Sequence, residues 1–443
     1  MASPGFLGID VGTSGVRAVL IDEAGRVLAE GRAALPASQR APQGHVRQDP
    51  WQWWHALLEA LEVLAARAEL GTVAALAVDA TSGTVLVVDP TGQPLEPARM
   101  YDDCAAAGSA RRIAERAPPH SGAHGPGSGL AKAMELKARH PRGHILTQAD
   151  WLAQRLGAPA GASDENNALK LGYDPVERRW PAWVAELLPE LETIEVFPPG
   201  TAVGTVSREI ARRFGLPSGA VIAAGSTDSV AAALAAGIEA PGDAVTALGS
   251  TLALKLLTRQ PVFDPEHGVY SHRLGEVWLA AGASNSGGAV LARHFTPHEL
   301  ERLSRCIEPQ RDSGLDYYPL NTPGERFPIA DPGLLPRLTP RPEDDVRFLH
   351  GLLEGIARIE RQGYRLLARL SGTPVRRVLT SGGGAVNATW SALRQRLLGV
   401  PVCPARHTQA AVGAALLARA AHQGEPPLTL ASSSQADSRS EHG

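Results

Sequence analysis

The chain has few cysteines, no membrane-length apolar segment and no excess of basic residues. Its three cysteines, Cys104, Cys306 and Cys403, are widely separated in a sequence of 443 residues and form no Cys-x-x-Cys pair. This pattern excludes a disulfide framework and a cysteine-based zinc site, and it favours a reducing compartment. No run approaches the ~20 apolar residues of a membrane span, and no charged segment followed by an apolar one begins the chain. We therefore expect a cytoplasmic protein without a membrane partner.

The charge balance argues against nucleic acid as a partner. The formal net charge is −3 and the pI is near 6.5, whereas nucleic-acid-binding proteins usually carry a basic stripe. Hydrophobic residues make up 44% and charged residues 20% of the chain, as in soluble globular proteins. A chain of this length is sufficient for two or three domains with well-formed cores.

A polar turn separates two apolar strands near the N-terminus. The first strand ends at Asp10, and the turn Gly12-Thr13-Ser14 precedes the second strand. Glycine permits close approach of the main chain to a ligand, so backbone N–H groups and the two hydroxyls become available as donors to a phosphate. Asp10 is then placed to face a Mg²⁺ ion or a substrate hydroxyl. The alternative is an ordinary β-hairpin with a polar tip, because short motifs of this kind also occur by chance.

A second turn of the same kind, Gly249-Ser250-Thr251, joins the apolar segments 244–248 and 252–257. Gly12 and Gly249 lie 237 residues apart. A spacing this large indicates two domains that each begin with a phosphate-contacting hairpin, and it does not fit a short-period solenoid. Two such tips facing each other across a cleft would hold the phosphates of a nucleotide from both sides.

An aspartate, Asp228, follows an apolar strand and precedes a helix of small residues that ends at Gly237. At this position it is either the N-cap of the helix or a functional carboxylate, because open α/β sheets bind ligands at the carboxyl ends of their strands. A sugar hydroxyl is a weak nucleophile, and a carboxylate within hydrogen-bond reach orients it and accepts its proton as a phosphoryl group arrives. Asp228 is therefore the candidate general base.

Three consecutive glycines, Gly382, Gly383 and Gly384, follow the apolar strand at 377–379 and open another helix. Such a loop allows a phosphate or a flat ligand to lie directly on the backbone. The alternative is a plain flexible loop. On the helix that follows, Asn387 and Trp390 could border an adenine ring, although Trp390 fits the hydrophobic core equally well.

The remaining sequence has α/β patterning. Asp49 and Pro50 form a start signal for a helix whose tryptophans we expect to pack on a sheet. Segments 73–79 and 84–89 predict strands, residues 104–200 are more helical, and the stretch 120–129 is expected to form loops over a cleft. A fresh α/β pattern from about 221 to 421 places the domain junction near residues 225–242.

Taken together, these motifs resemble the FGGY family of carbohydrate kinases, within the actin/hexokinase/heat-shock ATPase superfamily, over nearly the whole chain. The resemblance rests on Asp10 to Ser14, Gly225 to Asp228 with Gly237, Gly249 to Thr251, Leu353 to Ala357, and Ser381 to Gly384 with Asn387 and Trp390. It implies an α/β fold of two actin-like, ribonuclease H-like ATPase domains that flank a nucleotide and sugar cleft. The N-terminal domain, residues 1–230, would carry the sugar side and the first phosphate hairpin. The C-terminal domain, 231–421, would carry the nucleotide side. Residues 422–443 are rich in Ser, Gln, Glu and Gly, and this composition predicts a disordered tail.

Within the family, segments 78–85, 99–103 and 282–288 are similar to a compact branch of cyanobacteria and plants that is associated with D-ribulose phosphorylation. The resemblance implies conversion of D-ribulose to D-ribulose 5-phosphate with ATP and Mg²⁺ as cofactors. Asp228 would be the catalytic base, Asp10, Ser82 and Asp228 would bind the sugar, and Asp10 would hold the metal. The implied nucleotide-binding residues are Gly12, Thr13, Ser14, Gly249, Ser250, Thr251, Gly382, Gly383, Gly384 and Asn387.

Several alternatives stay open at the level of sequence. The same chemistry on D-xylulose is the nearest one, followed by L-ribulose or a polyol, and a non-catalytic ATPase or sugar-binding member of the superfamily is another. The chain lacks insertions that larger members use for sugar choice and dimer contacts, so both a monomer and a homodimer are compatible with it. His124 and Lys132 are candidates for reading the distal hydroxyls of the sugar, although Lys132 fits a solvated helix residue better.

Overall fold

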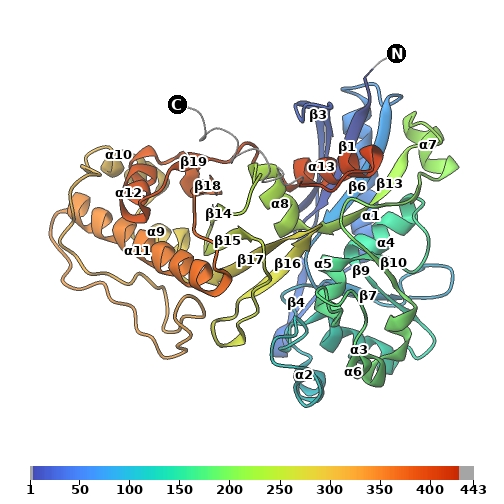
Figure 1. Cartoon of the computed structure of the whole chain (residues 1–443), viewed down its shortest axis with the longest axis horizontal. Coiled ribbons are helices and arrows are strands. Elements are labelled where there is room, and N and C mark those ends of the chain that lie inside the picture. The colour runs from blue at the N-terminus through green and yellow to red at the C-terminus, as the bar shows by residue number, and fades with distance from the viewer. Residues whose placement is uncertain (1–2, 429–443) are drawn as a thin grey trace, which may run out of the picture.

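A computed structural model describes residues 3–428 as two lobes, each built on a six-stranded mixed sheet (Figure 1). The first sheet has the strand order β12-β13-β6-β1-β2-β3. Its strands are β1 (Gly5–Val11), β2 (Gly15–Ile21), β3 (Val27–Ala34), β6 (Val73–Ala80), β12 (Ala202–Thr205) and β13 (Val221–Thr227). β1 runs parallel to β6, and β6 runs parallel to β13. The carboxyl ends of these three strands therefore meet at one edge of the sheet.

The second sheet has the order β16-β17-β15-β14-β18-β19. Its strands are β14 (Asp243–Leu248), β15 (Leu252–Thr258), β16 (Tyr270–Leu274), β17 (Val277–Ser284), β18 (Arg377–Ser381) and β19 (Val402–Pro404). β14 and β15 form an antiparallel hairpin, and β14 runs parallel to β18 with Ala247 opposite Ser381. The turn after β14 and the glycine-rich loop after β18 therefore lie next to each other.

Two smaller sheets extend the first lobe. One has the order β4-β5-β8-β7-β9 and the other pairs β10 with β11. Their strands are β4 (Gln39–Ala41), β5 (His45–Gln48), β7 (Val85–Val88), β8 (Ala98–Arg99), β9 (His144–Thr147), β10 (Ala162–Asp164) and β11 (Glu195–Phe197). The helices of the described chain are α1 (Pro50–Ala65), α2 (Ala107–Ala114), α3 (Gly129–Arg139), α4 (Gln148–Leu156), α5 (Glu165–Ala168), α6 (Ala182–Leu187), α7 (Arg208–Phe214), α8 (Asp228–Ala236), α9 (Gly288–His294), α10 (Pro297–Ser304), α11 (Asp345–Ser371), α12 (Ala388–Leu398) and α13 (Ala410–Gln423).

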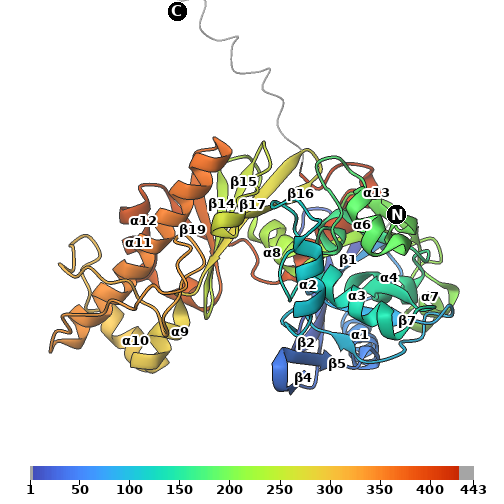
Figure 2. The same ribbon diagram turned by 90° about the horizontal axis from the view of Figure 1, so that it is seen from below.

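Most helices belong to one lobe or the other, and α8 and α13 lie at the junction between the lobes. Figure 2 shows α9, α10, α11 and α12 around the second sheet, whereas α1 to α4, α6 and α7 surround the first lobe. α13 is the last helix of the described chain, yet it packs against β1, β6 and β13 and against α8. At α13 the chain thus returns to the first sheet, where this helix lies at the junction of the two lobes.

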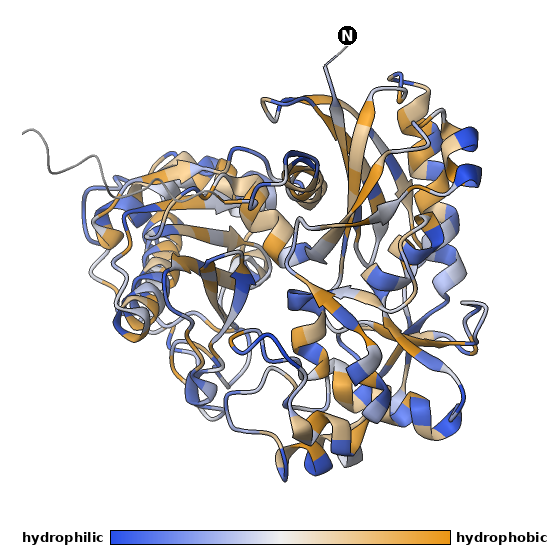
Figure 3. Cartoon of the chain, turned by 45° about the vertical axis from the view of Figure 1, so that its right-hand side comes forward, coloured by the Kyte–Doolittle hydropathy of each residue, from blue (hydrophilic) through white to orange (hydrophobic). Residues whose placement is uncertain are grey.

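The buried apolar side chains form cores that follow this division. Figure 3 colours the ribbon by hydropathy and shows apolar segments along the strands and helices of both lobes. One core lies between α1 and the first sheet, where Trp53 and Trp54 are buried. Another surrounds α11 and the second sheet. A third joins the lobes, since it contains side chains of β1, α8 and α13 together with Leu257 and Leu279 of the second sheet. The tryptophan-rich helix is therefore a packing element, as the sequence predicts.

The packing of α13 on β1 requires a glycine at position 8. A Cβ added at Gly8 would lie 1.9 Å from the carbonyl oxygen of Ala411 and 2.3 Å from the backbone nitrogen of Ala415. Real Cβ atoms do not approach backbone atoms so closely, so the helix would have to move away from the sheet.

We expect Gly8→Ala to lower the free energy of unfolding by about 1–3 kcal/mol, because overpacking against a backbone cannot relax by a change of side-chain rotamer. Urea denaturation followed by circular dichroism measures the effect. Gly108→Ala in α2 is the matched control, because a Cβ at Gly108 meets no atom within 4 Å. Equal stabilities of the two variants would contradict this account of the contact.

The elements predicted around the key motifs are confirmed. Both hairpins form, Asp49 caps α1 by accepting a hydrogen bond from the N–H of Trp51, and β6 and β7 cover the predicted strands. Of the tail predicted at 422–443, residues 429–443 lie outside the described part of the chain. Over residues 3–428, none of the helices has the length and apolar character that crossing a membrane demands.

Candidate active site

A cavity of about 730 Å³ opens where the edge of the first sheet faces the second lobe. The first hairpin, the loop after β6 and the start of α8 form one side, and Tyr270 of β16 contributes from the other. The lining side chains that matter for chemistry are Asp10, Thr13, Ser14, Arg17, Ser82, Tyr101, His124, Lys170, Asp228 and Tyr270. The cavity therefore unites the predicted base, the predicted sugar-binding residues and the first phosphate hairpin.

Asp10 lies at the end of β1, opposite Asp79 of β6 in the parallel register. Burial raises the pKa of Asp10, while the neighbouring Asp79 side chain and the charge of Arg17, whose Nη1 is 3.7 Å from Oδ2, oppose the shift. Asp79 is completely buried, and burial together with the charges of Asp10 and Asp228 raises its pKa well above the ordinary value. Of the two carboxyl groups, Asp79 is the one whose ionised form is more strongly disfavoured, and Asp10 is the one that faces the cavity.

Asp228 is the first residue of α8, directly after β13. The N-cap position belongs to Thr227, so the interpretation of Asp228 as the cap of this helix is wrong. Burial and the charge of Asp10 raise the pKa of Asp228 to about 6, against the opposing effects of Lys255 and the Ser229 N–H. A carboxylate with this pKa is ionised at neutral pH and still basic enough to accept a proton.

The loop after β6 presents a hydroxyl group that has no hydrogen-bond partner among residues 3–428. Thr81 is held by Gln148, whose Oε1 accepts from the Thr81 hydroxyl at 2.6 Å. The neighbouring Ser82 lines the cavity, and its buried Oγ makes no hydrogen bond within the described residues. Because a buried hydroxyl without a partner is costly, Ser82 is well suited to bind a polar ligand.

The predicted nucleotide-side residues form a separate cluster on the second lobe. Gly249-Ser250-Thr251 is the exposed turn between β14 and β15, and the loop at Gly382 follows the neighbouring strand β18. Gly382 has a φ of +84°, and a Cβ there would lie 2.6 Å from the carbonyl oxygen of Leu248. Only glycine allows the loop to turn this close to the end of β14. These residues do not line the 730 Å³ cavity.

Asn387 and Trp390 serve the fold of the second lobe. The Asn387 Oδ1 accepts from the Trp390 N–H at 2.9 Å as the cap of α12, and its Nδ2 donates to the Ser304 hydroxyl at 2.8 Å. Trp390 is 2% exposed, and its Nε1 donates to the Leu353 carbonyl. Trp390 is therefore a core residue, and a role of Asn387 at the nucleotide stays a prediction.

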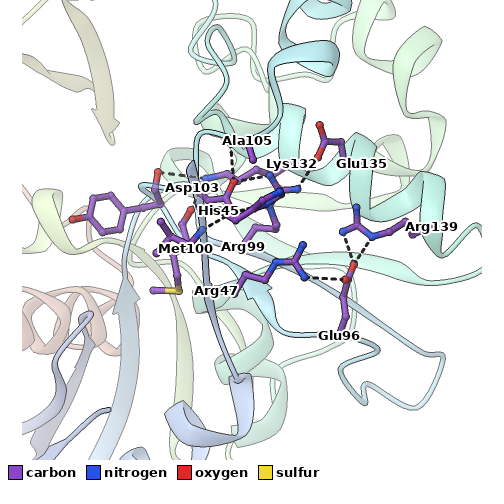
Figure 4. Close-up of polar contacts among 12 residues, drawn as sticks. His45, Arg47, Glu96, Arg99, Met100, Asp103, Ala105, Lys132, Glu135 and Arg139 are labelled. Carbon is purple, nitrogen blue, oxygen red and sulfur yellow. Dashed lines mark hydrogen bonds and ion pairs between the residues drawn. The ribbon is translucent and has the colours of Figure 1, made fainter. Parts of the chain in front are cut away.

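The structure contradicts both interpretations of Lys132, because this residue neither faces the sugar cavity nor lies in solvent. It is fully buried, and its Nζ donates to the carbonyl of Met100 at 2.8 Å. Figure 4 shows it beside Arg99 and Asp103, which form a buried ion pair at 2.5 Å. This cluster fixes the backbone next to Tyr101, a cavity residue. His124, by contrast, does line the cavity.

Of the ten cavity side chains named above, Arg17, Tyr101, Lys170 and Tyr270 were not predicted from the sequence. Only Lys170 and Tyr270 are far from any predicted motif, and the Lys170 Nζ lies 3.6 Å from the centroid of the Tyr270 ring. This contact joins the first lobe to β16, so no local pattern could have revealed it.

Comparison with known proteins agrees with this geometry. The model of the FGGY family of carbohydrate kinases, N-terminal domain, matches residues 6–235, and the model of the C-terminal domain of the same family matches residues 244–422. The chain belongs to the FGGY family of carbohydrate kinases. It is thus a sugar kinase that uses ATP as a substrate, and the predicted fold of two actin-like ATPase-type domains is confirmed.

Relatives of this FGGY kinase match it over nearly their whole length. A xylulose kinase of Streptomyces coelicolor is 28% identical over 97% of this chain and 90% of its own length. A xylulose kinase of Bacillus subtilis is 25% identical over 93% of this chain and 87% of its own. A crystal structure from Brucella ovis, described as that of a xyloylose kinase, has a TM-score of 0.85 and 26% identity, covering 96% of this chain and 91% of that one.

Proposed function

We propose that this FGGY kinase transfers the γ-phosphoryl group of ATP to a hydroxyl of a pentulose, with D-xylulose as the preferred acceptor. The observation that carries the proposal is that Asp228, Asp10 and the first phosphate hairpin line one cavity. The choice of D-xylulose rests on the similarity to xylulose kinases over most of the chain.

Asp228 acts as the general base in this proposal. Its carboxylate accepts the proton of the attacking hydroxyl while the oxygen forms a bond to the γ-phosphorus and the bond to the ADP leaving group breaks. Most of the rate enhancement in such a transfer comes from positioning and charge stabilisation. The backbone and the hydroxyls of Thr13 and Ser14 supply donors for the phosphoryl oxygens from the first hairpin.

The residues at the cavity also fit a Mg²⁺ ion. Mg²⁺ in phosphoryl-transfer sites is bound through one or two carboxylates, water and the phosphates of the substrate. Asp10 is a carboxylate that faces the cavity beside the first hairpin, so it is the residue that would hold the ion, directly or through water. When bound, Mg²⁺ would neutralise charge on the phosphates.

D-ribulose is the second candidate acceptor. The segments 78–85 and 99–103, which resemble the D-ribulose-associated branch, contribute Ser82 and Tyr101 to the cavity. The Ser82 hydroxyl, which makes no hydrogen bond within residues 3–428, lies in the same cavity as Asp10 and Asp228, the other predicted sugar-binding residues.

The deciding experiment measures ADP release by the purified protein with Mg·ATP and D-xylulose, D-ribulose, L-ribulose or a polyol, with a reaction without sugar as background. Strong stimulation by D-xylulose supports the proposal. Preference for D-ribulose keeps the chemistry and changes the acceptor, whereas no stimulation by any sugar would overturn the proposed function.

The rate is expected to depend on pH through Asp228. Its pKa of about 6 lies above the ordinary value because burial and the charge of Asp10 disfavour the ionised form. Below this pKa the base is protonated, so kcat should fall about tenfold for each unit of pH below 6 and level off above it. A pH–rate profile with saturating substrates tests this, and a flat profile down to about pH 5 would contradict the assignment of the base.

A further inference from the structure

One cation near the proposed base has no role in the mechanism so far. Lys255 lies in the middle of β15, whose other residues are apolar apart from Thr258. Its Nζ donates a hydrogen bond to the backbone carbonyl of Ser229, the residue after Asp228. Over residues 3–428, Lys255 forms no ion pair with a carboxylate. The lysine is therefore a charge held beside the start of α8 by a backbone carbonyl.

This hydrogen bond crosses between the two domains. Lys255 belongs to the segment matched by the C-terminal family model, whereas Ser229 and Asp228 belong to the segment matched by the N-terminal one. In the sheet, Lys255 pairs with Ala281, and Ala281 pairs with Tyr270. Directly opposed residues of neighbouring antiparallel strands lie on the same face. Lys255 thus points to the same side of the sheet as the cavity residue Tyr270.

The charges around Asp228 make a cation at this position significant. The charge of Asp10 on β1 disfavours the ionised form of Asp228, and the charge of Asp228 in turn acts on Asp79 of β6 and on the phenol of Tyr101. On the other side, Asp228 is the acidic group whose charge acts on Lys255. His272, close to Lys255 on β16, is buried and neutral because burial lowers its pKa well below the ordinary value. Two further cations, Arg17 and Lys170, line the same cavity, and Arg17 lies 3.7 Å from Asp10, whereas Lys255 is the cation whose charge acts on Asp228.

We propose that Lys255 is a positioning residue for Asp228. Its hydrogen bond to Ser229 holds the first turn of α8, and its charge keeps the neighbouring carboxylate ready to accept the proton of the sugar. The inference rests on the proposed role of Asp228 as the base. Lys255 also comes four residues after Thr251, at the end of the second phosphate hairpin. One short strand thus connects the nucleotide side of the second lobe with the base in the first.

The test separates the charge of Lys255 from its hydrogen bond. Lys255→Gln removes the charge and keeps a donor for the Ser229 carbonyl, and Lys255→Arg keeps both. Loss of a nearby opposite charge raises a carboxyl pKa by about one unit or more. In Lys255→Gln the acid limb of the pH–rate profile should therefore move up by about one pH unit, with little change in KM for ATP. Lys255→Arg should retain the wild-type profile.

Asn166→Ala is the matched control for a purely structural role of the domain contact. The buried Asn166 of α5 bonds the Ser226 hydroxyl and the carbonyl of Arg273 on β16, so it also joins the lobes, without contributing charge. Its loss should lower stability and leave the acid limb in place. An acid limb that shifts equally in Asn166→Ala and Lys255→Gln would overturn the proposal, as would an unchanged limb in Lys255→Gln.

A measurement of the Asp228 pKa without substrate tests this inference separately from the proposed function. Proteins with isotope-labelled aspartate carboxyls are titrated by NMR, and the signal of Asp228 is identified by its absence in Asp228→Asn. A titration midpoint that rises in Lys255→Gln and in Lys255→Met, but not in Lys255→Arg, supports the inference even if neither pentulose is phosphorylated. An unshifted midpoint would refute it even in an active kinase.

Discussion

Replacing Asp228 with asparagine should reduce sugar-dependent ADP release by about 10²–10⁴-fold, the range that a general base contributes to a rate. The side chain keeps its size and its place at the start of α8, but it no longer accepts a proton. Because the loss concerns the chemical step, kcat should fall while KM for ATP stays close to the wild-type value. Steady-state kinetics with D-xylulose and Mg·ATP measures both constants.

Two controls make this result specific. Asp316→Asn removes a carboxylate from an exposed ion pair with Arg337, where the Asp316 side chain is 79% exposed, and it should leave kcat unchanged. ADP binding to Asp228→Asn, measured by calorimetry, should match that of the wild type. A variant that loses ADP binding together with activity would assign Asp228 to the nucleotide and not to the sugar hydroxyl.

The sequence predicts the local parts of this site well, because each part is a strand followed by a turn. Asp10, the first hairpin and Asp228 follow apolar strands, and such strands in an α/β chain end at a common edge. The structure indeed places β1, β6 and β13 in adjacent positions. The order of the strands could not be predicted from the sequence, since a parallel neighbour such as β6 is brought to β1 by tertiary packing.

Contacts between residues far apart in the sequence explain which features of the site were not predicted. Lys132 has the pattern of an exposed helix residue, and only the loop around Met100, folded over its Nζ, makes it a buried donor. Asp79 appears as the last polar residue of an apolar strand, and its pairing with Asp10 depends on the register of two parallel strands. Lys255 does give one signal, a single charge within the apolar run of β15. That signal shows that the charge needs a partner without showing which one.

Beneath the nucleotide-side loops, a buried ion pair connects the strands that carry them. The guanidinium of Arg394 donates to both carboxylate oxygens of Glu360 at 2.7 Å and to the Thr380 hydroxyl of β18 at 2.9 Å. Thr246 of β14 donates to the same carboxylate at 2.6 Å. Arg394 and Glu360 are both 0% exposed. The network therefore sets the distance between the strands that end at Gly249 and Gly382.

Arg394→Met should lower the free energy of unfolding of the second lobe by about 3–5 kcal/mol, because it leaves the Glu360 carboxylate buried without its partner. Urea unfolding followed by tryptophan fluorescence measures the loss. Arg305→Met, which breaks an exposed pair with Glu301, should cost less than about 1 kcal/mol.

The double variant Arg394→Met with Glu360→Met separates the ion pair from simple loss of packing. Since an apolar replacement of a whole buried pair is often neutral, it should recover part of the stability that Arg394→Met loses. Its KM for ATP should nevertheless stay above the wild-type value, because Thr246 and Thr380 lose the groups that hold β14 and β18 in place. A double variant as unstable as Arg394→Met would show that the guanidinium matters for its packing. An unchanged KM for ATP would show that the loops keep their geometry without the network.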